Sequence, residues 1–520
     1  MALGAQPLGR AGWGGVAVAA LLLLLTLGAL GAVFWRAGGT SGLGPADWAA
    51  IRFTVWQAAL SAGLSVALAI PVARALARRS FRGRQIIVTL LGAPFLLPTL
   101  VAVLGLLAVF GRNGIFNDWL MALGLPPLRI YGPQGVILAH VFFNMPLATR
   151  LILQGWQSIP AERFRVAASL GFRPYDILRR IEVPMLRTVL PGALLAIFLI
   201  CLTSFAVALT LGGGPRATTV ELAIYQAFRY DFDLGRAAML AGVQFALCAA
   251  ATLIALRVPL TDSLAGLGRP VQRWDKRGRL TVDLIAVALA MVFLLLPLGM
   301  VVAAGLPRIP HLPAAVWSAA GRSVVVALGS ACLTLVFALF LGIAILRARR
   351  SLSGGLELAG MLSLAASPLV MGTGLFLIVF PLVDPARLAL AVTALVNATM
   401  ALPFALRAIL PALRQADRDL RRLADSLNIR GLARLRFVIL PPLRAPLGFA
   451  GGLAAALSMG DLGVIVLFAE AGNATLPMQL QRLMGAYRMA DASGAAVLLL
   501  GLSLAAFWIF DRGGRLGART

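Results

Sequence analysis

One acidic residue lies where a charge is costly. Asp461 is near the middle of an apolar run that covers residues 446–468. A carboxylate inside a membrane is expensive, so such a residue is by default a functional candidate. The equivalent place 257 residues earlier holds Ser204 and Phe205. We interpret Ser204, Phe205 and Asp461 as part of a path or gate, and we favour gating or helix packing over cation recognition.

Other reactive side chains do not form a catalytic or metal-binding pattern. Cys201, Cys248 and Cys332 lie in apolar runs without a CxxC spacing, and His140 and His311 are far apart in sequence. These spacings do not favour a disulfide framework or a metal site. The sequence also lacks GxxxxGK[ST], the loop that cradles ATP phosphates. We therefore expect no catalytic residue, no metal and no cofactor in this chain, and we do not expect an enzyme.

Two basic, amphipathic segments resemble each other. Residues 163–192 match residues 421–448 at an offset of 257, which aligns Leu170 with Leu427. Each segment predicts a short helix, a turn and a second short helix, with Gly171 or Asn428 at the turn because both tolerate a left-handed backbone. A basic surface helix can simply bind anionic lipid. Because the hairpin is duplicated in one register, we favour a pair of docking elements for a two-fold partner.

The composition is that of an integral membrane protein. Of 520 residues, 60% are hydrophobic, the mean hydropathy is +0.91 and the net charge is +26. Continuous apolar runs of about 20 residues predict membrane-spanning helices, hence an all-α polytopic fold in a lipid bilayer. The arginines lie in short loops between these runs, which is the positive-inside pattern rather than a nucleic-acid surface.

Twelve spans can be drawn, and every arginine-rich loop then falls on one side, so both termini are predicted to be cytoplasmic. The predicted spans are 15–35, 53–73, 86–110, 134–154, 190–211, 237–256, 281–304, 323–346, 357–381, 388–409, 446–468 and 494–511.

The spans form two halves of six, which predicts parallel repeats because an even number preserves orientation. We place the first half at residues 1–260, with a core of about 53–256, and the second at 281–520, with a core of about 320–511. The polar stretch 261–280 between them is interpreted as a cytoplasmic linker.

The hairpins resemble a known motif. Ala167 to Gly171 reads AASLG, with Val183-Pro184 at a fixed spacing, and this resembles the EAA loop of ABC importer type-1 permeases. The second copy, Ala424 to Asn428 with Leu440-Pro441, resembles it too. Both copies depart from the motif, which has an acidic residue where this chain has Arg165 and Arg422. The segment from Leu209 to Asp233 is similar to the fused, two-half permeases of thiamine importers.

The resemblance implies an importer subunit of the bacterial inner membrane that moves thiamine, with thiamine phosphates as further cargo. Two copies of an ATP-binding subunit would hold the ATP, and a periplasmic binding protein would deliver the substrate. The implied coupling residues are Arg165, Ala167, Leu170, Gly171, Pro184, Arg422, Ala424, Leu427, Asn428 and Pro441. On the outer segment, the candidates for contact with the binding protein or the entering ligand, against an alternative of a solvated loop, are Glu221, Tyr225, Asp231 and Asp233.

Three alternatives compete with this interpretation. A fused ferric-iron permease has the same architecture. A twelve-helix secondary transporter of the major facilitator type also has parallel six-span halves, but it would lack matching EAA-like hairpins. A membrane-embedded enzyme would need a His/Asp or Ser/His constellation, which the sequence does not contain.

Overall fold

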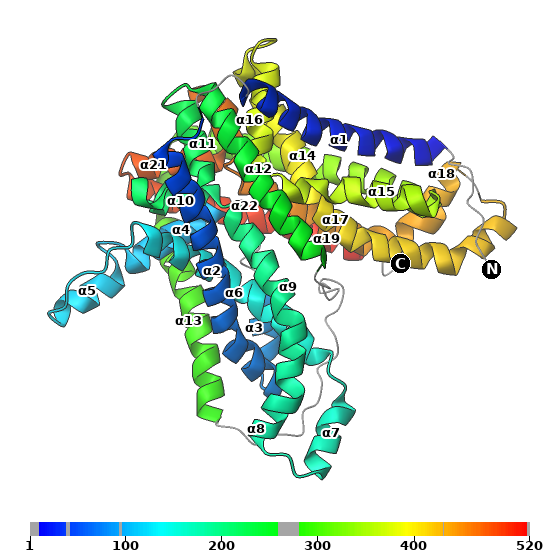
Figure 1. Ribbon diagram of the computed structural model, residues 1–520, viewed down its shortest axis with the longest axis horizontal. Helices are drawn as coiled ribbons and strands as arrows, with labels where there is room; N and C mark the ends of the chain where they lie inside the picture. The colour runs from blue at the N-terminus through cyan, green and yellow to red at the C-terminus, as the bar shows by residue number, and fades with distance from the viewer. Residues whose placement is uncertain (1–9, 38–41, 93–95, 258–279, 430, 517–520) are drawn as a thin grey trace. The chain divides into compact units, whose positions relative to one another are not determined.

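The computed structural model describes residues 10–37, 42–92, 96–257, 280–429 and 431–516, and every regular element within these ranges is a helix (Figure 1). The predicted all-α fold is therefore confirmed. Eleven of the helical segments are long and apolar enough to cross a membrane. The predicted linker, 261–280, falls outside the described residues except for its last residue.

The segment predicted as a ninth continuous span, 357–381, is broken in the structure. Helix α15 (Arg350–Met361) is followed by a short turn of 3₁₀-helix, η5 (Leu362–Ala365), and then by α16 (Pro368–Val379). Pro368 has no N–H and suits the first position of a helix, and the Ser367 hydroxyl accepts a hydrogen bond from the Val370 N–H. Because α16 has only 12 residues, the prediction of one continuous span there is wrong.

Contacts divide the chain into two compact units. One unit contains Gly44–Ala223 and Leu247–Pro307. Its helices are α2 (Pro45–Arg78), α3 (Arg84–Leu90), α4 (Thr99–Phe110), α5 (Ile115–Ala122), α6 (Pro133–Gln157), α7 (Ala161–Ser169), α8 (Pro174–Ile177), η2 (Leu178–Glu182), α9 (Val183–Leu202), α10 (Phe205–Leu211), η3 (Pro215–Ala217) and α13 (Leu280–Gly305).

The other unit contains Met1–Leu43, Ile224–Ala246 and Arg308–Thr520. Besides α15, η5 and α16, its helices are α1 (Arg10–Ala37), α14 (Ala314–Arg347), α17 (Pro385–Ser426), α18 (Gly431–Arg434), η6 (Leu435–Ile439), α19 (Leu440–Met459), α20 (Ile465–Phe468), η7 (Ala471–Asn473), α21 (Leu476–Gly485) and α22 (Met489–Leu516). Three helices have residues assigned to both units: α11 (Val220–Arg229), α12 (Leu234–Arg257) and η4 (Leu306–His311).

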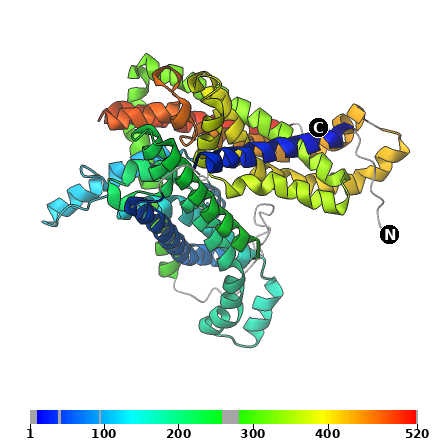
Figure 2. The same ribbon diagram turned by 45° about the horizontal axis from the view of Figure 1, so that its top comes forward.

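Helices α1 and α13 do not pack within their own halves of the sequence. Helix α1, drawn in dark blue, lies against α14 and α16, drawn in yellow-green to yellow (Figures 1 and 2). A Cβ on Gly374 of α16 would lie 2.3 Å from the Ala29 carbonyl oxygen of α1. In the other unit, α13 lies against α2 and α4, and a Cβ on Gly105 would lie 2.6 Å from the Pro297 oxygen. Small residues thus permit close helix contact at both places, and the compact units differ in membership from the predicted sequence halves.

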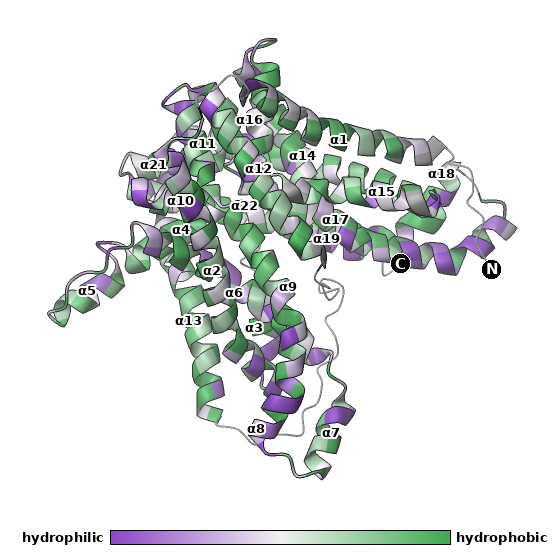
Figure 3. Cartoon of the chain, in the orientation of Figure 1, coloured by the Kyte–Doolittle hydropathy of each residue, from purple (hydrophilic) through white to green (hydrophobic). Residues whose placement is uncertain are grey.

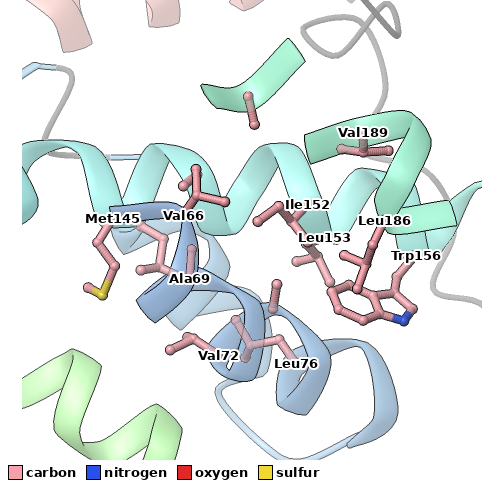
Figure 4. Packing of buried hydrophobic residues seen from close by; sticks show 14 of the residues in the cluster. Val66, Ala69, Val72, Leu76, Met145, Ile152, Leu153, Trp156, Leu186 and Val189 are labelled. Carbon is pink, nitrogen blue, oxygen red and sulfur yellow. The ribbon is translucent and has the colours of Figure 1, made fainter. Parts of the chain in front are cut away.

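The core that supports the first hairpin is formed by α2, α6 and α9 (Figure 4). Ala69 and Leu76 of α2 face Ile152 and Trp156 of α6, and all four side chains are buried. Phe164, Ala167 and Ile177 of the hairpin belong to the same apolar cluster. The hairpin is therefore anchored on the spans by its apolar side.

Candidate functional site

The first hairpin has the predicted helix–turn–helix form. Helix α7 ends at Ser169, Gly171 takes a left-handed backbone with φ of +67°, and α8 begins at Pro174. The Phe172 N–H donates to the Ala167 carbonyl at 2.9 Å, which closes the turn. Figure 3 shows hydrophilic residues gathered on this hairpin and on the C-terminal part of α17, in contrast to the apolar spans.

The second hairpin has the same turn but a different first helix. Asn428 takes a left-handed backbone with φ of +52°, and the Ile429 N–H donates to the Ala424 carbonyl at 2.9 Å. The hydrogen bond that closes the turn therefore occurs at the same place in both hairpins, 257 residues apart. The preceding helix is not a separate short segment, however, because α17 runs for 42 residues from the predicted span 388–409 into the hairpin. The prediction of a separate short first helix in this copy is therefore wrong.

The predicted coupling residues fall into two groups. Ala167 and Ala424 are buried against their spans, with 2% and 1% of their surface exposed. Leu170 and Leu427, by contrast, are 65% and 61% exposed at the tips. Neighbouring Val166 and Leu423 are both exposed at 56%, again at an offset of 257. Each hairpin therefore presents two apolar side chains to its surroundings, and we name Val166, Leu170, Leu423 and Leu427 the tip residues.

The remaining coupling candidates surround the tip residues. Arg165 is exposed and lies 3.8 Å from Glu162, while Arg422 is exposed in the second copy. Pro184 and Pro441 stand at the start of α9 and α19. Directly before each proline the backbone forms one turn of π-helix, η2 (Leu178–Glu182) and η6 (Leu435–Ile439), once more 257 residues apart.

The π-helical turns have a physical cause that sequence reasoning missed. A proline has no N–H to donate and its ring clashes with the carbonyl four residues earlier. A wider turn relieves this clash, and the Val183 and Leu440 N–H groups bond to carbonyls five residues earlier, at Leu178 and Leu435. In the sequence, the pairs Val183-Pro184 and Leu440-Pro441 were the signal from which these wider turns could have been predicted. Turns of this kind are frequent at functional sites.

A buried ion pair fixes the joint between the first hairpin and α2. Glu182 is fully buried, and its carboxylate accepts a hydrogen bond from the Arg74 side chain at 2.8 Å. Sequence analysis did not single out either residue, because the two are 108 positions apart. The pair links the hairpin directly to a long membrane helix.

The path candidates lie at breaks in two helices. Helix α9 ends at Leu202, and α10 begins at Phe205 after Ser204. In the other unit α19 ends at Met459, and the backbone is non-helical around Asp461 before α20. The continuous spans predicted at 190–211 and 446–468 are therefore wrong. Asp461 accepts a hydrogen bond from the Gly463 N–H at 3.1 Å. A short acidic side chain can bond a nearby backbone N–H in this way and so take the place of the backbone carbonyl that would accept it in a helix.

Buried polar side chains lie directly beside both breaks, and sequence analysis missed them. Near the α9 break, the Gln57 amide donates to the Cys201 carbonyl at 3.0 Å, and the Asn144 amide donates to the Cys201 sulfur at 3.3 Å. Near the α19 break, the Asn397 amide donates to the Ser458 hydroxyl at 3.0 Å. Cys201 and Ser458 are 257 residues apart, so the two breaks share a polar environment.

The outer-segment candidates differ in exposure. Glu221 and Tyr225 of α11 are buried, with 1% and 8% exposure, whereas Asp231 and Asp233 are on the surface. Burial, with the neighbouring Tyr230, raises the pKa of Tyr225 to about 12, so this phenol stays neutral at physiological pH. Only the two aspartates are accessible to a docking protein in this conformation, and Asp231 pairs with Arg236 at 2.9 Å.

The described residues contain no group of three His, Cys, Asp or Glu side chains that would hold a metal ion. Each unit contains one tip-bearing hairpin joined through a π-helical turn to a helix that breaks, near Ser204 in one unit and near Asp461 in the other.

Comparison with known proteins shows what these features belong to. A scan against protein-family models finds no match. The thiamine transport system permease protein ThiP of Escherichia coli is 39% identical over 538 residues, covering 98% of each chain. The chain belongs to the thiamine transport system permease family. The ThiP protein of Brucella abortus strain 2308 is 40% identical and covers 96% of this chain and 94% of its own.

A more distant relative covers only part of the chain. The sulfate transport system permease protein CysW of Synechocystis is 26% identical over 205 residues, 39% of this chain. The resemblance to thiamine importer permeases, drawn from the segment Leu209 to Asp233, is confirmed by the ThiP relatives. Together with eleven candidate spans, membership makes the chain a multi-pass membrane transport permease.

Proposed function

We propose that the chain is the pore-forming subunit of an ATP-driven importer that moves thiamine across the bacterial inner membrane. The observation that supports this most directly is the pair of hairpins with matched exposed tip residues, in a chain nearly co-extensive with ThiP relatives. Thiamine phosphates are a further cargo under this proposal. The hairpins and both termini would lie on the cytoplasmic side.

The hairpins would work by docking on two copies of an ATP-binding subunit. Each exposed leucine can enter an apolar groove, and burying such a side chain contributes about 1.5–3 kcal/mol. Movement of a docked hairpin would pass through the π-helical turn to α9 or α19, and so to the breaks beside Ser204 and Asp461. Hydrolysis of ATP would take place on the partner, and this chain would supply the mechanical link.

The outer end would receive substrate from a periplasmic binding protein. Asp231 and Asp233 are the exposed acids that would contact it. Asp461, with Asn397 and Ser458 nearby, would act in gating, because its Oδ1 atom accepts from the Gly463 N–H at the break between α19 and α20. A ferric-iron permease remains the competing candidate for the same architecture.

Substrate identity is tested by reconstituting the chain in nanodiscs with its ATP-binding subunits. Thiamine-loaded binding protein is expected to stimulate ATP hydrolysis, and thiamine-free or ferric-loaded binding protein is expected to have no effect. Stimulation by the ferric-loaded protein alone would contradict thiamine as the cargo and favour the iron permease.

The turn at Gly171 provides a prediction with an internal control. Replacing Gly171 with Val places a β-branched residue at φ of +67°, which costs about 1–2 kcal/mol. We expect this variant to hydrolyse ATP but to take up several-fold less thiamine per ATP, while its spans insert normally. Gly171→Asn is the control, because Asn428 already occupies the same conformation in the second hairpin, and it is expected to retain uptake. Equal uptake by the Val variant and the wild type would count against a role of this turn in coupling.

A further inference from the structure

The two hairpins are held in place by different forces. In the first hairpin, Phe164 on α7 and Ile177 on α8 are 2% and 5% exposed and belong to one apolar cluster. The positions 257 residues later are Arg421 and Arg434. The two side chains that anchor the first hairpin by apolar packing are therefore both cations in the second.

The second hairpin compensates with carboxylates at positions that are uncharged in the first. Asp425 replaces Ala168, and Asp417 replaces Pro160. Arg434 on α18 donates to Asp425 on α17 at 2.7 Å, and its second terminal nitrogen lies 4.0 Å from Asp417. Arg421 lies 3.9 Å from each aspartate. One arginine thus ties the second helix of the hairpin to both acids on the first.

Burial distinguishes this cluster from an ordinary surface pair. The Arg434 side chain is 15% exposed, whereas the Asp417 and Asp425 side chains are 35% and 47% exposed. Arg434 also lines a small cavity of about 20 Å³, together with Arg421, Leu413 and Val438. Arg347 of α14 faces the cluster and interacts electrostatically with Asp417 and Arg434. A partly buried network keeps more of its strength than an isolated exposed pair, yet its exposed side is weakened by salt.

The position of the network connects it to coupling. Arg434 directly precedes η6, the π-helical turn before α19, and Asp425 lies two residues before the tip residue Leu427. A fixed distance between Arg434 and Asp425 therefore holds the tip residue Leu427 in place relative to α19.

We propose that Arg434 and Asp425, supported by Arg421 and Asp417, form an ionic latch that positions the second hairpin for its ATP-binding subunit, whereas the first hairpin has the apolar packing of Phe164 and Ile177 at the positions of the two arginines. This inference rests on the proposed function. It follows that ionic strength acts on the second coupling contact through the partly exposed latch, and acts less on the first, whose ion pair has a fully buried Glu182 carboxylate. Arg434 and Asp425 are positioning residues, since they act through the tip.

The first experiment needs no partner protein. Hydrogen exchange of the hairpin amides is measured in the full-length permease in nanodiscs. Because the Arg434–Asp425 hydrogen bond is charged but open to solvent on the Asp425 side, Arg434→Met is expected to speed exchange in residues 418–429 several-fold. Asp425→Asn should have a similar effect, and the double variant should be no worse than either single variant. Additive effects, or unchanged exchange in Arg434→Met, would overturn the latch.

The second experiment rebuilds the second hairpin with the residues of the first. Arg434→Met is expected to lower uptake, because the tip is no longer held in position. The triple variant Arg421→Phe, Asp425→Ala, Arg434→Ile is expected to restore that uptake and to show the same hydrogen exchange at low and high salt. Ile177→Ala is the matched control in the first hairpin, and it should loosen that hairpin at all salt concentrations alike. A triple variant as salt-sensitive as the wild type would contradict the latch.

The two proposals can fail separately. If the wild-type assembly shows no ATP-driven uptake, the proposed function fails, whatever the exchange data show. If the wild type transports but the exchange and salt results contradict the latch, only the latch fails.

Discussion

Replacing Leu170 and Leu427 with Asp in one chain is expected to abolish ATP-driven uptake and binding of the ATP-binding subunits. The two leucines are 65% and 61% exposed on the hairpin tips, so the substitutions leave the fold of the permease intact. Each loses about 1.5–3 kcal/mol of apolar burial at the docking groove and places a charge there instead. The combined loss corresponds to a decrease of at least about 100-fold in affinity. Pull-down of the ATP-binding subunit and uptake in proteoliposomes measure it.

The neighbouring serines give a matched control. Ser169 and Ser426 directly precede the two leucines, are also exposed and are also 257 residues apart. Ser169→Asp with Ser426→Asp adds the same charge to the same hairpins without removing the apolar tips. We expect this variant to retain most of its binding. If both double variants bind alike, net charge rather than the tip residues determines docking.

Removing Arg74 is expected to have the largest effect on stability. In Arg74→Met, the fully buried Glu182 carboxylate loses its 2.8 Å ion pair. Breaking a fully buried pair from one side costs about 3–5 kcal/mol, and we expect a smaller loss here because Arg74 is 28% exposed and Glu182 makes further interactions. Replacing both partners by apolar residues of similar size is often neutral. We therefore expect Arg74→Met to unfold at a clearly lower temperature, and Arg74→Met with Glu182→Leu to recover much of the difference. Thermal unfolding in detergent, followed by size-exclusion chromatography, provides the measurement.

An exposed pair of nearly the same length serves as the control. Arg414 and Glu357 lie 2.9 Å apart, but their side chains are 47% and 39% exposed. Arg414→Met is expected to cost less than about 1 kcal/mol, because water and salt screen such pairs. Equal destabilisation by Arg74→Met and Arg414→Met would show that burial of Glu182 does not determine the effect.

The features predicted correctly from the sequence are those that local chemistry determines. The turn at Gly171 and Asn428 follows from the tolerance of both residues for a left-handed backbone, and the structure has both at positive φ. The all-α fold follows from apolar runs long enough to cross a bilayer. Alignment of two copies in one register paired Leu170 with Leu427, and the structure shows that both are exposed.

The wrong predictions concern continuous spans. In each of these runs the residues are predominantly apolar, but the backbone does not form one continuous helix. The run 357–381 is apolar throughout, yet Ser367 and Pro368 start a new helix inside it. The runs around Ser204 and Asp461 are likewise apolar, and hydropathy does not register a broken backbone. Their true geometry depends on distant partners, such as Gln57 for Cys201, which the linear sequence does not reveal.

Helix pairing was also beyond the sequence. Hydropathy shows that α1 and α13 are apolar but not which helices cover them. Gly374 and Gly105, where α16 and α4 are approached closely, resemble many other glycines in membrane helices. The ion pair between Arg74 and Glu182 and the latch at Arg434 likewise join residues that only the fold brings together.

The central claim is that this chain converts ATP hydrolysis on a partner into thiamine movement through two hairpins. The most direct test is uphill accumulation of labelled thiamine in proteoliposomes that contain the chain, its ATP-binding subunits and thiamine-loaded binding protein. The account predicts accumulation that requires ATP and is lost in the Leu170→Asp, Leu427→Asp variant. Accumulation driven by an ion gradient without ATP-binding subunits, and unaffected by that variant, would contradict the account and identify a secondary transporter.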